Sequence, residues 1–194
     1  MHLFIFEWTP TLQNAPSAGS GHQELPLGHI FSCYMVAMMI GSRGFDLLVS
    51  SQSSDSDSSS SSLSSRTAAR RCRNCLTMAF VLGAAAFYIS AAPQFDRLVK
   101  LGAFCTFEVA VGVYYPSLGV IKAARIPESL RTTISSLLRT PLNVIVVATL
   151  FGAKELNPAL VLQACGVGLS IATVLSFVSS TLESKVDLAT VKRE

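Results

Sequence analysis

Five long apolar windows constrain the fold of this chain more than any other feature. They cover residues 27–48, 76–92, 98–121, 132–152 and 158–178. Each is close to the roughly 20 residues that a helix needs to cross the hydrocarbon core of a bilayer. Strands that cross a membrane are shorter and alternate apolar with polar side chains, whereas these windows do not alternate. The sequence therefore predicts an all-α membrane protein with five transmembrane helices.

The composition supports a membrane protein and excludes two other classes. Hydrophobic residues make up 50% of the 194 residues and charged residues 14%, whereas an average soluble domain has roughly 25% charged residues. Five cysteines are too few for a disulfide scaffold of this length. The net charge of +3 is too small to indicate a nucleic-acid-binding protein, so we expect no nucleic-acid partner.

The sequence contains no motif of the common enzyme classes. It lacks GxSxG, HExxH and GxxxxGK[ST], the signatures of serine hydrolases, zinc peptidases and phosphate-binding loops. Cys72 and Cys75 form one CxxC pair, which supplies too few ligands for a structural zinc site. His2, His22 and His29 do not have a metal-ligand spacing. We expect neither an enzyme nor a metal site, and no cofactor.

The segments outside the apolar windows carry separate signals. Residues 1–12 include an apolar stretch that is too short to span a bilayer, and we interpret them as the end of a helix whose beginning is missing. Residues 50–65 contain twelve serines, a composition that predicts disorder because it cannot bury a core. The predicted segments are a non-cytoplasmic loop at 13–26, a disordered Ser-rich cytoplasmic linker at 49–75, a cytoplasmic loop at 122–131 and a cytoplasmic tail at 179–194.

The lysines and arginines predict the orientation of the chain. Twelve of the fifteen lie in or beside the linker, the loop at 122–131 or the C-terminal tail, and only Arg97, Lys100 and Lys154 lie elsewhere. The three basic regions face the same side if all five windows cross the membrane. Because basic residues accumulate on the cytoplasmic side of membrane proteins, we expect a cytoplasmic C-terminus. The expected location is the cell membrane.

Glu108 is a candidate functional residue because it lies in the middle of the third window. Ionisable side chains are costly in lipid and usually face a bundle interior or a cavity. The helical repeat places Cys105, Glu108, Gly112 and Tyr115 on one face, and Pro116 predicts a bend just beyond them. One hypothesis is that Glu108 relays protons in a coupled transporter. The alternative is a structural hydrogen bond or salt bridge between helices.

Arg139 is the second ionisable residue within a window. It lies near Thr140 and Asn143, and Pro141 frees a backbone carbonyl one turn earlier, which predicts a kinked and polar stretch of helix. Such a site suits an anion or a partner carboxylate such as Glu108. The alternative is that the long side chain of Arg139 extends to the cytoplasmic surface.

The motifs also occur in an order that resembles a known family. Those of the first part are Trp8-Thr9-Pro10, Pro26-Leu27-Gly28, Ile30-Phe31-Ser32 and Met39-Ile40-Gly41-Ser42. Those of the second part are Phe107-Glu108 with Gly112-Val113-Tyr114 and Pro116-Ser117, Ile126-Pro127-Glu128, and Arg139 with Pro141-Leu142-Asn143. Together they resemble the molybdate-anion transporter family, the domain-containing-protein-5 branch of the major facilitator superfamily.

The resemblance implies a transporter of twelve helices, with two six-helix halves and alternating access between them. The chain would correspond to the C-terminal half, with residues 1–12 as the remnant of helix seven, and would carry molybdate or a related oxyanion. The N-terminal half or a second copy would then be its partner. The candidate substrate or coupling residues are Glu108, Tyr115, Arg139 and Asn143, and the helix-kink residues are Pro116 and Pro141. The alternative function is that of a truncated membrane protein that does not transport and acts only through a partner.

Overall fold

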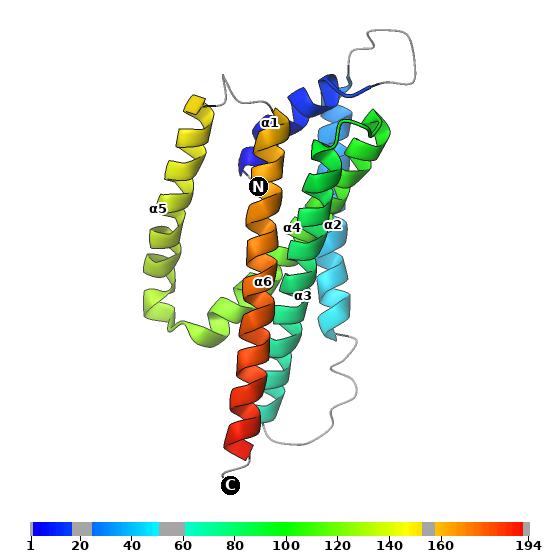
Figure 1. The fold of residues 1–194 in the computed structure, drawn as a ribbon. Coiled ribbons are helices and arrows are strands. Elements are labelled where there is room, and N and C mark those ends of the chain that lie inside the picture. The colour runs from blue at the N-terminus through cyan, green and yellow to red at the C-terminus, as the bar shows by residue number, and fades with distance from the viewer. Residues whose placement is uncertain (1, 17–24, 51–60, 153–157, 192–194) are drawn as a thin grey trace.

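The fold is helical throughout the part of the chain that the structure describes. The computed structural model describes residues 2–16, 25–50, 61–152 and 158–191, and shows no strand among them (Figure 1). Its helices are α1 (His2–Gln13), α2 (Leu27–Ser50), α3 (Ser61–Ala91), α4 (Arg97–Arg125), α5 (Glu128–Gly152) and α6 (Pro158–Val191). Several of these helices are apolar and of spanning length, so the expected all-α membrane class is confirmed.

Four helices of the described part are long and apolar enough to cross a membrane. The spanning segments are Leu27–Val49 in α2, Arg70–Ala91 in α3, Arg97–Ala124 in α4 and Ala159–Leu182 in α6. Helix α5 is not among these four, and the side chains of residues 148–152 at its end lie outside the described part. The expected span at 132–152 is helical, but its crossing of the membrane stays a prediction.

Four helices extend into segments that were expected to be loops. Residues 61–75 of the expected disordered linker belong to α3, most of the expected loop at 122–131 belongs to α4 and α5, and residues 179–191 of the expected tail belong to α6. Residues 51–60 lie outside the described part. The extensions have a common reason: extending a helix that has already formed is easier than starting one, and Ala, Leu, Arg and Lys have high helix propensity.

Pro127 separates α4 from α5. Ile126 adopts an extended backbone, with φ −115° and ψ 124°, and its N–H donates to the Lys122 carbonyl. This conformation is expected of a residue before proline, because the ring of Pro127 disfavours a helical backbone at the preceding position. The connection is therefore a two-residue turn between long helices.

The spanning helices pack in the order α2, α4, α3, α6. Helix α3 contacts both α4 and α6, α2 lies mainly on α4, and the short α1 lies against α6 and α4. Helix α5 stands apart from this bundle and contacts α4 (Figure 1). At the end of α1, the Arg97 Nε donates to the Leu12 carbonyl at 3.1 Å and the Arg97 backbone N–H donates to the Pro16 carbonyl at 3.2 Å. Arg97 thus ties the end of α1 to the start of α4.

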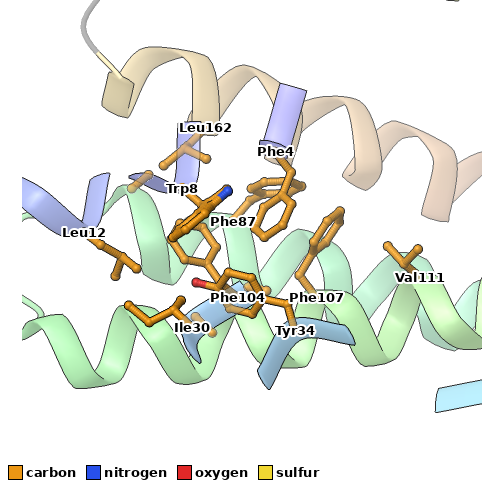
Figure 2. Close-up of a cluster of buried hydrophobic side chains, with 13 residues drawn as sticks. Phe4, Trp8, Leu12, Ile30, Tyr34, Phe87, Phe104, Phe107, Val111 and Leu162 are labelled. Atoms are coloured by element: carbon orange, nitrogen blue, oxygen red, sulfur yellow. The ribbon is translucent and has the colours of Figure 1, made fainter. Parts of the chain in front are cut away.

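Aromatic side chains fill the space between α1, α2, α3 and α4. Figure 2 shows Phe4 and Trp8 of α1 against Tyr34 of α2 and the phenylalanines of α4. The ring centroids of Phe4 lie 5.5 Å from Tyr34 and 5.3 Å from Phe104, both in edge-on geometry. Such aromatic pairs each add about 0.5–1.5 kcal/mol to the burial of their surface. Helix α1 is therefore part of the core although it is too short to span a bilayer.

Glycines allow α2 and α4 to lie in backbone contact. A Cβ atom built on Gly41 would overlap the Val109 carbonyl oxygen, and one built on Gly112 would overlap the Met38 carbonyl oxygen. Small residues let membrane helices approach closely, which matters because no hydrophobic effect drives helices together in lipid. Tyr34 lies beside Phe104 and Met38 beside Gly112, so the two helices run in the same direction.

The close contact predicts a large difference between two glycines of α4. Gly112→Ala places a methyl group against the backbone of α2, and we expect it to lower the free energy of unfolding by about 1–3 kcal/mol, as overpacking does. Gly119→Ala is the matched control, because a Cβ there has nothing within 4 Å. It should leave stability unchanged or raise it by up to about 1 kcal/mol, since alanine favours a helix. Unfolding of each variant in detergent micelles measures both values, and equal effects would contradict the contact.

Candidate functional site

Glu108 is buried inside the bundle between α4 and α2. Its exposed fraction is 1%, and it lies one helical turn before Gly112, on the face that contacts α2. Among the described residues, the carboxyl oxygen Oε2 has no hydrogen-bond partner. An unpartnered buried polar group costs about 1–3 kcal/mol and is rare in native proteins. A carboxyl in this position therefore points to a function.

Tyr34 supplies a second unpartnered oxygen in the same part of the bundle. It lies on α2 with an exposed fraction of 0%, and its hydroxyl has no hydrogen-bond partner among the described residues. Its ring packs edge-on against Trp8 and Phe104, with centroids 5.4 Å and 6.4 Å away. Phe104 lies one turn before Glu108 on the same helix. Two adjacent helices thus direct a phenol and a carboxyl toward one region.

The two groups favour a proton or a hydrogen-bond donor and disfavour an anion. A carboxyl group accepts hydrogen bonds, and a phenol can either donate or accept one. An ionised carboxylate repels an oxyanion, so Glu108 by itself does not form an anion site. The buried pair is suited to holding a proton.

The remaining residues of the predicted face around Glu108 differ in their exposure. Cys105 is half-buried, whereas Tyr115 is exposed, with an exposed fraction of 53%, and its ring lies 5.4 Å from that of Tyr114. Pro116 lies within α4, which continues to Arg125. Because proline has no N–H, it cannot donate to the Gly112 carbonyl one turn earlier. The structure therefore groups Glu108 with Gly112 in the interior and leaves Tyr115 on the outside.

Arg139 and Asn143 lie on α5, away from Glu108. Both are exposed, and they share one face of the helix at a spacing of four residues. In the described residues, Arg139 and Glu108 form no ion pair, since Glu108 is enclosed by α2 and α4 while α5 stands apart (Figure 1). The structure therefore does not bring these two residues together. Pro141 lies within α5 and does not end it.

The sequence did not indicate three of the buried polar residues. Tyr34 is a single tyrosine in an apolar window, and nothing in its spacing separates it from a core residue. Glu7 and Lys100 are also buried, with exposed fractions of 9% and 7%. Glu7 could have been recognised, because it is a charged residue between the apolar Phe6 and Trp8. Among the described residues, no group of three or more His, Cys, Asp or Glu could hold a metal ion.

Comparison with known proteins finds similarity to transporters. Residues 1–64 match a family model described as sugar transporters with 12 TM segments. The chain is 28% identical over 149 residues to the molybdate-anion transporter of Takifugu rubripes, a match that covers 75% of this chain and 26% of that protein. It is 30% identical over 146 residues to the molybdate-anion transporter of Xenopus laevis, covering 75% of this chain and 28% of that protein. No solved structure matches the chain.

The chain spans about a quarter of the length of the curated relatives that it matches. The matched part nevertheless covers three quarters of this chain, far more than any single motif. The expected resemblance is thereby confirmed: this is an integral, multi-pass membrane protein related in sequence to the molybdate-anion transporters of the major facilitator type.

Proposed function

We propose that the chain forms part of an alternating-access carrier for molybdate or a related oxyanion. The observation that supports this most strongly is its similarity to proteins named molybdate-anion transporters over 75% of its length. A carrier of this type needs apolar helices that cross the membrane and polar groups held away from lipid. The four spanning helices and the buried Glu108 meet both needs. The carrier is not an enzyme in this proposal.

In this carrier, α5 supplies the groups that bind the anion. Arg139 carries a positive charge and a planar set of N–H donors, which suits a tetrahedral oxyanion better than a point charge does. Asn143 adds a neutral amide donor on the same face. Pro141 leaves the Leu137 carbonyl, one turn earlier, without its usual N–H donor, which keeps the backbone beside Arg139 polar. Tyr115 and Pro116 of α4 belong to the transport path in this proposal. Tyr115 contributes a hydroxyl group, and Pro116 allows the helix to bend.

In this proposal, Glu108 couples transport to the movement of a proton and does not contact the anion. Its carboxyl lies inside the bundle between α2 and α4, whereas Arg139 lies exposed on α5. Separating the two charges keeps the carboxylate from repelling the substrate. Movement of α5 relative to the bundle would change the surroundings of Arg139 and of Glu108 together. Carriers whose two halves rock about a binding site work in this way.

The surface of α5 indicates where a partner is needed. Its exposed apolar side chains are Leu130, Leu137, Leu138, Val144, Ile145 and Val147. Because the charged Arg139 lies among these side chains, exposure of this surface to lipid is unfavourable. We propose that a further six-helix half, or a second copy of this chain, packs on α5 and encloses Arg139 and Asn143. Relatives about four times as long as the matched region are consistent with this.

Removal of the arginine charge tests the anion role. In cells that express the full-length gene product, Arg139→Ala should reduce the uptake of labelled molybdate about tenfold or more, because a hydrogen bond to a charged group contributes about 1.5–3 kcal/mol. Arg131→Ala is the matched control, since it removes the same charge from the same helix two turns earlier, and it should transport nearly as well as wild type.

Two outcomes of this experiment would contradict the proposal. If Arg139→Ala and wild type take up molybdate equally, Arg139 does not bind the anion. If the full-length gene product gives no more uptake than untransfected cells, the carrier function itself is wrong. The 194-residue chain expressed alone should support no uptake unless it pairs with itself, which a size measurement of the detergent-solubilised protein would detect.

The charge distribution predicts which end of the chain faces the cytoplasm. An epitope after residue 194 should be labelled by antibody only after the cell membrane is permeabilised, because the basic linker and tail lie on the inner side. An epitope inserted within residues 17–24 should be labelled on intact cells. The opposite pattern would reverse the orientation, and labelling of both epitopes only after permeabilisation would place the protein in an internal membrane.

A further inference from the structure

Two oxygen atoms in the core have no hydrogen-bond partner among the described residues, and they lie in the same interface. They are the Tyr34 hydroxyl of α2 and the Glu108 Oε2 of α4, on side chains with exposed fractions of 0% and 1%. The Tyr34 ring packs on Phe104, which lies one turn before Glu108 on α4. One unpartnered atom can be explained as a local defect in packing. Two complementary ones, a donor and an acceptor on neighbouring helices, form a site that takes a small polar ligand.

We propose that Tyr34 is the positioning residue for a proton carried on Glu108. The Tyr34 hydroxyl donates a hydrogen bond to the carboxyl group, directly after a small rotation or through one water molecule, and the pair holds one transferable proton between α2 and α4. The proposal rests on the proposed carrier function, in which Glu108 is the coupling group. It adds a residue on a second helix and identifies the ligand of the pair as a proton, not the anion.

The proton transfer balances with water as the partner. When the site opens to one side of the membrane, the O–H bond of the Glu108 carboxyl breaks and its proton passes to a water molecule, which becomes hydronium. The carboxylate that remains keeps the hydrogen bond from Tyr34, whose own O–H bond stays intact. Such a bond to a charged oxygen is about twice as strong as one to a neutral oxygen. The hydrogen bond from Tyr34 thereby lowers the free-energy cost of ionising Glu108 in an otherwise apolar interface.

The surroundings of the pair favour a neutral carboxyl in the closed state. Most of the side chains around Tyr34 are aromatic, from Phe4 and Trp8 of α1 and Phe104 of α4. The other titratable groups that act on Tyr34 or Glu108 are Cys33 and Cys105, together with the amino terminus of the chain. In the described residues, no lysine or arginine pairs with Glu108. A carboxylate that has no lysine or arginine beside it is unstable in such surroundings, so the carboxyl retains its proton.

The backbone contact of α2 with α4 determines whether the pair can form. Gly41 and Gly112 bring the two helices together about one to two turns beyond Tyr34. A separation of the helices at the glycines would move the hydroxyl away from the carboxyl and open the interface to water. Opening and proton release are therefore linked through one helix pair.

Infrared spectroscopy of the full chain in lipid vesicles tests the proposal without any substrate. A protonated Glu108 should give the C=O stretching band of a carboxylic acid, and Glu108→Gln should remove it. Tyr34→Phe should keep the band and shift it to higher wavenumber, because the C=O group loses a hydrogen bond. A merely structural tyrosine would not move this band. The same spectra of a chain with an acetylated amino terminus should show the band unchanged.

Two variants control for unspecific effects. Tyr88→Phe removes a phenol whose hydroxyl lies 3.3 Å from the Ser170 hydroxyl, far from Glu108 in the chain and on another interface. Glu128→Gln removes an exposed carboxyl of α5. Neither should alter the carboxylic acid band.

The outcomes separate this proposal from the carrier function. If wild type lacks the band, or Glu108→Gln leaves it intact, Glu108 does not carry the proton and the proposal fails. If Tyr34→Phe leaves the band where it was, Tyr34 does not position the proton and the proposal also fails. The expected bands in a protein that takes up no molybdate would support the proton pair and contradict the carrier function alone.

Discussion

The contact between the backbones of α2 and α4 is the constraint on which the rest of the structure depends. In lipid, helices do not gain a hydrophobic advantage from associating, so close packing has to hold them together. Gly41 and Gly112 permit this packing, because any side chain at either position would overlap the opposite backbone. The aromatic core, the depth of Glu108 and its closeness to Tyr34 all follow from how near these two helices lie.

The same contact explains how an ionisable residue can be retained inside a membrane protein. Glu108 follows an aromatic layer and precedes a glycine by one turn, so its carboxyl is enclosed by two helices instead of facing lipid. Burial makes the charged state unfavourable, and in the proposed pair the Tyr34 hydroxyl supports it with a hydrogen bond. In the proposed carrier, anion binding is left to α5, whose Arg139 lies outside this interface.

Much of the fold was predictable, because long apolar windows leave a chain few alternatives. The spanning helices and the burial of Glu108 follow from the hydropathy of the sequence and the cost of a charge in lipid. The helix ends were not predictable in the same way, since polar residues such as those at 179–191 continue a helix after it has left the apolar region. Tyr34 and the separation of Arg139 from Glu108 depend on which helices become neighbours. The pattern of residues along one sequence does not show which helices become neighbours, because the contacts join residues distant in the chain.

Crosslinking of two native cysteines tests the α2–α4 interface most directly. Cys33 of α2 directly precedes Tyr34, and Cys105 of α4 lies one turn before Glu108. In membranes that contain a variant with only these two cysteines, a short bifunctional thiol reagent should join α2 to α4, which is detected after cleavage of the chain between them. A variant that retains only Cys33 and Cys165 of α6 is the control and should not be joined. The absence of a crosslink between Cys33 and Cys105, with both thiols reactive, would contradict the interface and the site built on it.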